Sequence, residues 1–149
     1  MRLDEVIKTN RFTDENHKAS LNILYTAYWL KDHFISVLKP HGITLEQHNV
    51  MRILKGSHPK EVRVKDIATR MVEKSSNVPR IIDKLVAKNL AVRINSDIDK
   101  RETFVALTDK GISVIDDARI SIDQVTKKIS GVSEKEAATL NKLLEKMRG

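Results

Sequence analysis

Cysteine is absent from the 149-residue chain. Its absence excludes a disulfide framework, a cysteine-based zinc finger, an iron–sulfur cluster and a thiol redox sensor. Glycine and proline are scarce, with 5 and 3 residues, so we expect few loops and long elements. No apolar run approaches the roughly 18 residues of a transmembrane helix. The first residues hold acids and no apolar segment, so we expect no signal peptide, no membrane partner and a cytoplasmic protein.

Motifs of catalysis and metal binding are missing as well. There is no phosphate-binding loop, no HExxH and no nucleophile-elbow serine, so we do not expect an enzyme. No two histidines form an HxxxH pair, and we expect neither a metal site nor a cofactor. We expect capped or solvated positions for all five, which are His17, His33, His41, His48 and His58.

What the chain does have is enough apolar sequence for one domain and an excess of positive charge. Apolar residues make up 40% and charged residues 32%, and the net charge is +7. Residues 62–110 hold 11 basic and 7 acidic side chains, so over half of the excess lies in this middle third. A basic segment of this kind favours a nucleic-acid face, although a plain solvated surface remains an alternative.

Long amphipathic helices are predicted at both ends of the chain. The first runs from Thr13 to Leu38, and its apolar positions cover more than one face, so we expect a second subunit to cover one of them. Thr108 caps another helix, which Gly131 ends, and Ser133 begins the last one. We expect residues 1–39 and 112–149 to form dimerisation helices.

The middle of the chain predicts three shorter helices and a hairpin. Thr44 opens the first with a capping box, and Gly56 is expected to end it. The second spans 64–71, and the third spans 76–88. Apolar, β-branched segments at 90–95 and 102–107, joined by a polar turn, predict a β-hairpin. The whole chain is thus predicted to be mostly α with a small β-hairpin, with a winged helix-turn-helix over 44–111.

The 76–88 helix has the composition of a DNA-recognition helix. We expect Ser75 or Ser76 as its N-cap, Pro79 in its first turn, and Asn89 as a left-handed C-cap. Its polar face presents cations that can meet phosphate or guanine and an asparagine that can pair with adenine. That face comprises Ser76, Asn77, Arg80, Lys84 and Lys88, four of them at successive i, i+4 positions.

The segment 64–111 resembles the MarR (multiple-antibiotic-resistance regulator) family of winged-helix transcription factors. The stretch SSNVPRIIDKLVAKNLAVR is similar to the family's recognition helix and first wing strand. The wing pattern of acids, Arg and an apolar strand ending in Leu-Thr-x-x-Gly is present as Asp97, Asp99, Arg101, Val105, Leu107, Thr108 and Gly111. Asn89 departs from the family's usual glycine, which a left-handed asparagine can replace.

The resemblance implies a homodimer that reads a palindromic operator as a transcriptional regulator, which we expect to be a repressor. It also implies that the recognition helix enters the major groove and that Arg101, oriented by Asp99, enters the minor groove. Together with the helix face, this gives a predicted DNA-binding set of Ser75, Ser76, Asn77, Arg80, Lys84, Asp99, Lys100 and Arg101.

Two further possibilities concern effectors and function class. Relatives often bind small aromatic acids beneath the first long helix, where this chain carries Tyr25, Tyr28 and Trp29, although plain packing also explains these rings. The alternative functions are a winged-helix protein-interaction module and a non-specific, chromosome-associated DNA-binding protein. The basic residues Arg80, Lys84 and Arg101 count against the first, and a high specificity ratio over random DNA would exclude the second.

Overall fold

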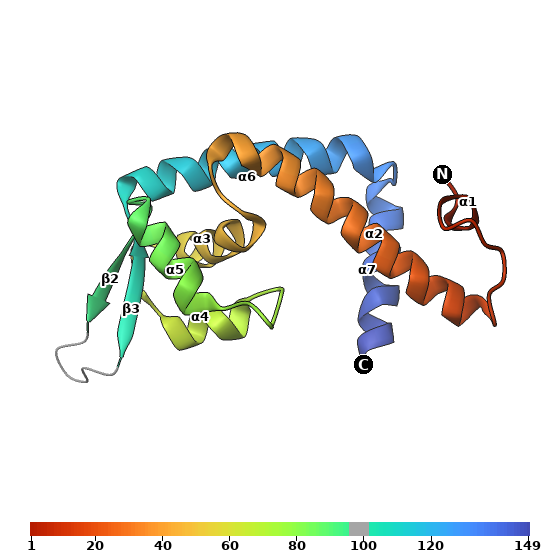
Figure 1. Cartoon of the computed structure of the whole chain (residues 1–149), viewed down its shortest axis with the longest axis horizontal. Coiled ribbons are helices and arrows are strands. Elements are labelled where there is room, and N and C mark those ends of the chain that lie inside the picture. Colours follow the sequence, from red (N-terminus) through yellow and green to blue (C-terminus); the bar gives the residue numbers. More distant parts are fainter. Residues whose placement is uncertain (96–101) are drawn as a thin grey trace.

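A computed structural model describes residues 1–95 and 102–149 (Figure 1). The elements follow one another as α1 (Leu3–Val6), α2 (Glu15–Leu38), a 3₁₀ turn η1 (Lys39–His41), α3 (Leu45–Ser57), β1 (Val62–Arg63), α4 (Val64–Arg70), α5 (Val78–Ala87), β2 (Ala91–Asn95), β3 (Thr103–Leu107), α6 (Asp109–Ser130) and α7 (Glu134–Arg148).

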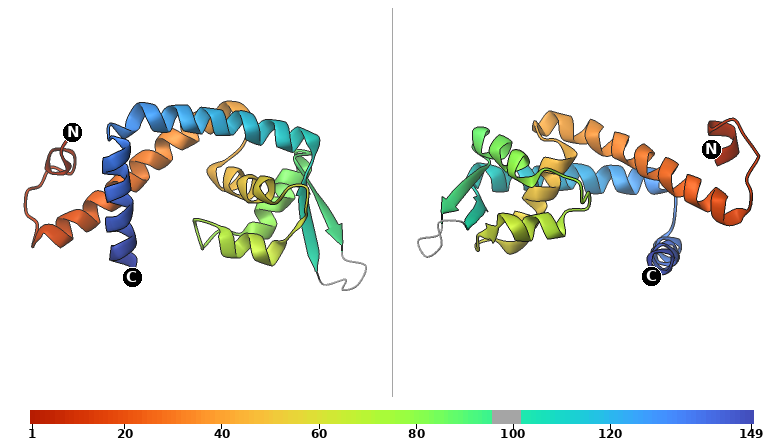
Figure 2. Two further views of the ribbon diagram at one scale, coloured as in Figure 1. Left: turned by 180° about the vertical axis from the view of Figure 1, so that it is seen from behind. Right: turned by 60° about the horizontal axis from the view of Figure 1, so that its bottom comes forward.

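The molecule consists of a lobe and two long arms. Helices α3, α4 and α5 and the small sheet form the lobe at one end, and α2 and α6 lie against each other and extend away from it (Figures 1 and 2). Helix α7 turns off the far end of α6, and α1 lies beyond the start of α2 (Figure 1). This arrangement confirms the predicted mostly helical winged-helix fold. None of the described helices is long and apolar enough to cross a membrane.

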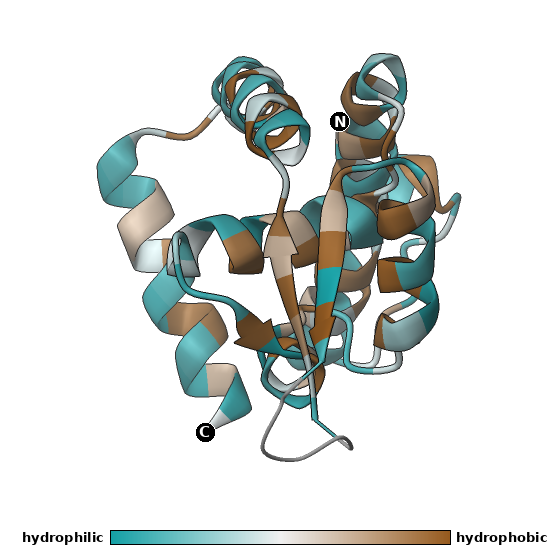
Figure 3. Ribbon diagram, turned by 90° about the vertical axis from the view of Figure 1, so that its left-hand side faces the viewer, coloured by the Kyte–Doolittle hydropathy of each residue, from teal (hydrophilic) through white to brown (hydrophobic). Residues whose placement is uncertain are grey.

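The hydrophobic core lies inside the lobe. Its buried apolar residues come from α3, α4, α5 and the strands, and Leu38 and Ile115 join the two arms to it. The buried residues of α5 are Val78, Ile82 and Leu85, and Ile81 and Val86 are partly buried against the same core. Seen from the lobe end, the strands of the sheet are mainly apolar, whereas α7 is mainly hydrophilic (Figure 3). Residues of both arms therefore complete the core of the lobe.

The wing is a three-stranded antiparallel sheet in the order β1–β3–β2. Strand β2 pairs with β3 as predicted, with Arg93 opposite Val105 and Ala91 opposite Leu107. Strand β1 was not predicted, because two residues are too short to show an alternating pattern. It forms because buried Val62 pairs with Val105 across the ladder.

Several predicted helix ends are confirmed, and others are corrected. The Thr44–Gln47 and Ser133–Glu136 capping boxes are both present, and the Ser133 backbone N–H lowers the pKa of the Glu136 carboxyl. Asn89 adopts the left-handed conformation with φ 58°. Gly56, however, does not end its helix, because α3 continues to Ser57. The first long helix begins at Glu15 with Asp14 as its cap, not at Thr13.

Most apolar residues of α2 are not buried within the chain, as they would be in a helix that is packed on several sides. Leu38 is the one buried residue of α2. Leu24 is 55% exposed, Tyr28 67% and Ile35 46%, and their spacing places them on one face. The chain itself thus covers one side of α2 and leaves an apolar side open.

Gly111 marks a close approach between α6 and the base of the wing. It lies in the first turn of α6, where its N–H donates to the capping Thr108 hydroxyl at 3.0 Å. A Cβ atom at this position would overlap the backbone carbonyl of Leu90 and lie 3.3 Å from Leu107 Cδ2. A backbone carbonyl cannot rotate away as a side chain can. The glycine of the Leu-Thr-x-x-Gly motif is therefore a packing requirement.

We expect Gly111→Ala to lower the free energy of unfolding by about 1–3 kcal/mol, although alanine normally stabilises a helix relative to glycine. Gly56→Ala is the matched control, because its nearest neighbour is the flexible end of the Arg70 side chain at 4.0 Å. That control should be neutral or stabilising by up to about 1 kcal/mol. Urea unfolding measures both variants, and equal effects would refute the packing argument.

Candidate nucleic-acid interface

The start of α5 is set by Asn77 and not by the predicted Ser75 or Ser76. The Asn77 side chain accepts the backbone N–H of Arg80 at 3.2 Å, and Pro79 lies in the first turn. Ser75 is exposed and its hydroxyl donates to Glu73 Oε1 at 3.4 Å, whereas the Ser76 hydroxyl is buried and has no partner within the described residues. The serines therefore belong to the turn between α4 and α5, next to the helix N-terminus.

Arg80 and Lys84 lie one helical turn apart on the exposed side of α5, opposite its buried stripe. Within the described residues neither forms an ion pair, so both guanidinium and ammonium groups are available to a partner. They line a hollow of about 310 Å³ between the first turns of α3 and α5, together with Ser76, Asn77 and Glu73. The structure thus brings four predicted DNA-binding residues together: Ser76, Asn77, Arg80 and Lys84.

Lys88 does not share this role, although the helical spacing placed it on the same face. Its ammonium donates to the carbonyl of Gly42 at 2.6 Å and to the Gln47 side-chain oxygen at 3.0 Å. Gln47 is buried and belongs to the capping box of α3. Lys88 therefore fixes the end of α5 to the start of α3. Spacing along one helix could not predict this, because the acceptors come from a segment about 40 residues away.

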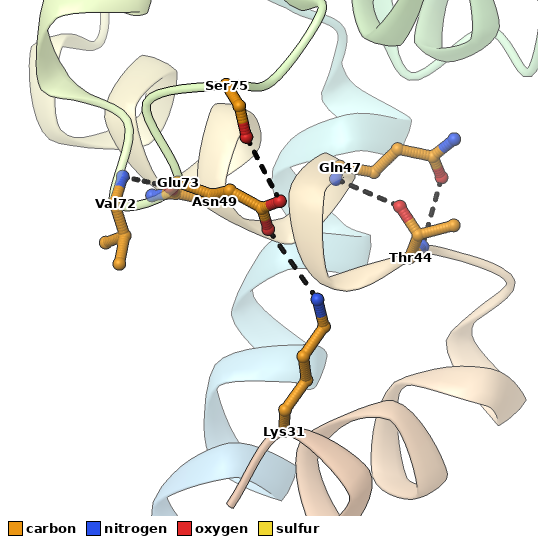
Figure 4. Close-up of polar contacts among 7 residues, drawn as sticks. All are labelled: Lys31, Thr44, Gln47, Asn49, Val72, Glu73 and Ser75. Carbon is orange, nitrogen blue, oxygen red and sulfur yellow. Dashed lines mark hydrogen bonds and ion pairs between the residues drawn. The ribbon is translucent and has the colours of Figure 1, made fainter. Parts of the chain in front are cut away.

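The turn before α5 is anchored to both neighbouring helices (Figure 4). The Val72 N–H donates to the Asn49 side chain of α3 at 2.9 Å. Lys31 of α2 pairs with Glu73 at 3.6 Å, and both side chains are partly exposed. These two contacts fix the segment 71–77 between α2 and α3. Because α5 follows this segment directly, they also fix the position of its N-terminus.

The wing adds a second basic region beside α5. A hollow of about 540 Å³ lies between β1, the start of α4, the first turn of α5 and strands β2 and β3, and its lining includes Arg63, Lys65 and Arg93. Arg63 pairs with Glu102 at 3.1 Å and lies over the Phe104 ring. Sequence reasoning missed all three of these cations. The predicted wing residues Asp99, Lys100 and Arg101 lie outside the described residues.

The aromatic residues of α2 are placed differently from one another. Tyr28 is exposed, whereas Tyr25 and Trp29 are half-buried and Trp29 packs on His33 with ring centroids 4.5 Å apart. None of them lines either hollow beside α5.

The histidines are spread over the fold. His17 and His33 bond to nearby backbone groups, and His41 bonds to the Ser121 hydroxyl at 2.9 Å. Burial lowers the pKa of His48, and Arg52 and His41 lower it further. No group of three or more metal-ligating side chains occurs in the described part of the chain.

Comparison with known proteins identifies the family. A model of the transcriptional regulators SarA/Rot matches residues 33–118, which is more than half of the chain. The transcriptional regulator MgrA of Staphylococcus aureus is 31% identical over 111 residues, which cover 74% of each protein. The chain belongs to the MarR/SarA family of winged-helix transcriptional regulators.

Solved structures have the same fold. AbsC, a MarR family regulator from Streptomyces coelicolor, matches with a TM-score of 0.81 at 22% identity, over 94% of this chain and 96% of AbsC. S. aureus MepR in a complex with DNA matches with a TM-score of 0.78 at 23% identity, over 92% and 97% of the two chains. A member of this regulator family is a DNA-binding protein and not an enzyme.

We predict that Arg80 selects bases and that Lys84 contacts phosphate. Arg80→Ala should cost about 1–3 kcal/mol on the preferred site and relax preference at one base position. Lys84→Ala should weaken all sequences about equally and reduce the salt dependence, because it removes one phosphate contact. Binding to a set of single-base operator variants at several salt concentrations separates the two. Unchanged base preference in Arg80→Ala would refute this docking of α5.

Proposed function

We propose that the protein is a homodimeric transcriptional repressor that binds a palindromic operator, one α5 helix to each half-site. The observation that carries this proposal is the exposed polar face of α5, where Arg80 and Lys84 project without ion-pair partners among the described residues. A helix of this kind fits the major groove, and the basic wing beside it fits the flanking DNA. Residues 44–111 would be the DNA-binding lobe of a single domain spanning 1–149. We also propose that the protein acts in the cytoplasm.

The dimer would be formed by residues 1–39 and 112–149. Helix α7 has no buried residue, yet Leu140, Leu143 and Met147 form one apolar stripe with exposed fractions of 49%, 60% and 55%. Helix α2 has a similar open face. Two apolar stripes on projecting helices support a partner subunit, because isolated helices gain little stability without packing.

We predict that Leu143→Glu converts the dimer to a monomer and weakens operator binding, because it buries a charge in the proposed interface. Val92→Glu is the matched control for the oligomeric state alone: Val92 is 44% exposed, but it lies on the wing and outside the proposed dimer interface. Sedimentation at micromolar concentration distinguishes them. A wild-type monomer, or a dimer that tolerates Glu at 143, would contradict the proposal.

The wing would enter the minor groove through Arg101, with Lys100 beside it and Asp99 holding the guanidinium in place. A narrow minor groove attracts arginine electrostatically. A restrained guanidinium loses less rotamer freedom on binding, so an aspartate near DNA would assist binding in spite of its charge.

We predict that Arg101→Ala lowers operator affinity strongly while changing the free energy of unfolding by no more than about 0.5 kcal/mol. Asp99→Ala should also weaken binding, although it removes a negative charge close to DNA. Operator titrations at fixed salt, with thermal unfolding as the stability control, measure both. Tighter binding by Asp99→Ala would refute the orienting role.

We further propose that a small aromatic effector binds near Tyr25, Tyr28 and Trp29. The half-buried rings of α2 lie on the arm that carries the proposed interface, so a ligand there could alter the geometry of the dimer.

Selection of bound DNA from a random library, repeated with candidate aromatic acids, tests operator and effector together. Recovery of no inverted repeat would refute the palindromic operator. Equal binding to all sequences would favour a non-specific chromosome-associated protein.

A further inference from the structure

We propose that Arg93 is a positioning residue that holds the wing at a fixed angle to α5, so that both elements meet one stretch of DNA in register. This inference rests on the proposed docking of α5 in the major groove and of the wing in the adjacent minor groove. It assigns to Arg93 a contact within the protein, and not a contact with DNA.

The guanidinium of Arg93 joins strand β2 to helix α5 through two contacts. Its Nη1 pairs with Asp83 Oδ1 at 2.5 Å, and its Nη2 donates to the carbonyl of Pro79 at 3.2 Å. Pro79 and Asp83 are one helical turn apart, so they lie on the same side of α5. A planar guanidinium that bridges two points on a helix fixes orientation as well as distance.

The position of these contacts makes them a brace. At one end of α5, the chain passes through Asn89 directly into β2, and the Leu90 carbonyl accepts the Thr108 N–H at 3.2 Å. This end is a hinge between helix and sheet. Arg93 lies two residues along β2, and it reaches back to the first turn of α5. The covalent connection at Asn89 and the Arg93 contacts nearer the other end of α5 together determine the angle between α5 and the sheet.

A second ion pair among the described residues of the wing cannot perform this function. Arg63 and Glu102 connect β1 to the residue before β3, so they stabilise the sheet itself. By contrast, the Arg93–Asp83 pair crosses from the sheet to the helix that carries Arg80 and Lys84. Its side chains are 38% and 59% exposed, and pairs of that kind add little to the free energy of unfolding. The brace therefore serves orientation more than stability.

A fixed angle has a consequence for DNA recognition. The bases read by α5 and the flanking minor-groove bases are a set distance apart along the duplex, and a wing that pivots would meet the flank in several registers. Loss of the brace should therefore blur preference at the flanking positions and leave preference at the α5 positions intact.

The test is selection of bound DNA from a random library with the full chain and with Arg93→Gln and Asp83→Asn. Arg119→Gln is the matched control, because Arg119 forms a similarly exposed pair with Asp123 on α6, away from the wing. A flanking base change costs a specific DNA-binding protein on the order of tenfold in affinity. We expect that cost in the wild type and the control, and a cost below roughly threefold in both brace variants.

Asp83→Asn separates positioning from charge. Removal of a carboxylate beside DNA raises affinity for every sequence if charge alone matters, with flanking preference unchanged. The brace predicts that flanking preference is lost even where overall affinity rises. Should Arg93→Gln fail to fold, Asp83→Asn still tests the ion pair of the brace from the helix side, because it leaves only the contact with the Pro79 carbonyl.

Three results would overturn the inference. Wild-type flanking preference in both variants would mean that the angle does not depend on Arg93. A uniform loss of affinity in Arg93→Gln, with flanking preference intact, would make Arg93 a phosphate contact. Absence of flanking preference in the wild type itself would refute the wing docking on which the inference rests, and the wild-type selection alone identifies that case.

Discussion

The contact between α6 and the base of the wing is the constraint on which the rest of the structure depends. Gly111 packs against the Leu90 carbonyl, and the Thr108 hydroxyl donates to the Asn89 carbonyl at 2.7 Å. Lys110 adds a bond to the Lys88 carbonyl at 3.3 Å. The end of α5, the start of β2 and the start of α6 therefore meet at one junction.

The basic residues around α5 divide into two groups with different roles. Lys88 and Arg93 have their donors directed to groups inside the lobe, so each stabilises a relation between α5 and a neighbouring element. Arg80 and Lys84 project outward with their charges uncompensated in the described residues. A net charge counts all four alike, and all four are exposed, but only the first pair has its charged groups bonded within the described residues. Lys88 and Arg93 thus fix the geometry in which Arg80 and Lys84 would act.

Local signals were enough to predict most of the fold. Capping residues such as Thr44, Thr108 and Ser133 and the left-handed Asn89 are determined by neighbours within a few positions, so the sequence pattern locates them. Some errors were local, because neighbouring polar residues compete as caps: Asn77 caps α5 and Asp14 caps α2. The other errors arose where distant contacts decide. Strand β1 forms on β3, and Lys88 turns toward Gly42. In the candidate site, Arg80 and Lys84 followed from helical spacing, whereas the Arg93 brace depends on how sheet and helix pack and has no pattern in the chain.

The lobe buries its apolar residues within one chain, whereas the arms leave apolar residues exposed. This difference separates two distances in the proposed complex: that between the wing and α5 within a half-site, and that between the two half-sites. The lobe buries its core within one chain, so the Arg93 brace can fix the wing against α5 within a half-site. The arms leave the stripes of α2 and α7 open, so in the proposed dimer the second subunit that covers them would set the distance between half-sites. An effector that moves the arms would then change the spacing between half-sites while each lobe keeps its own internal geometry.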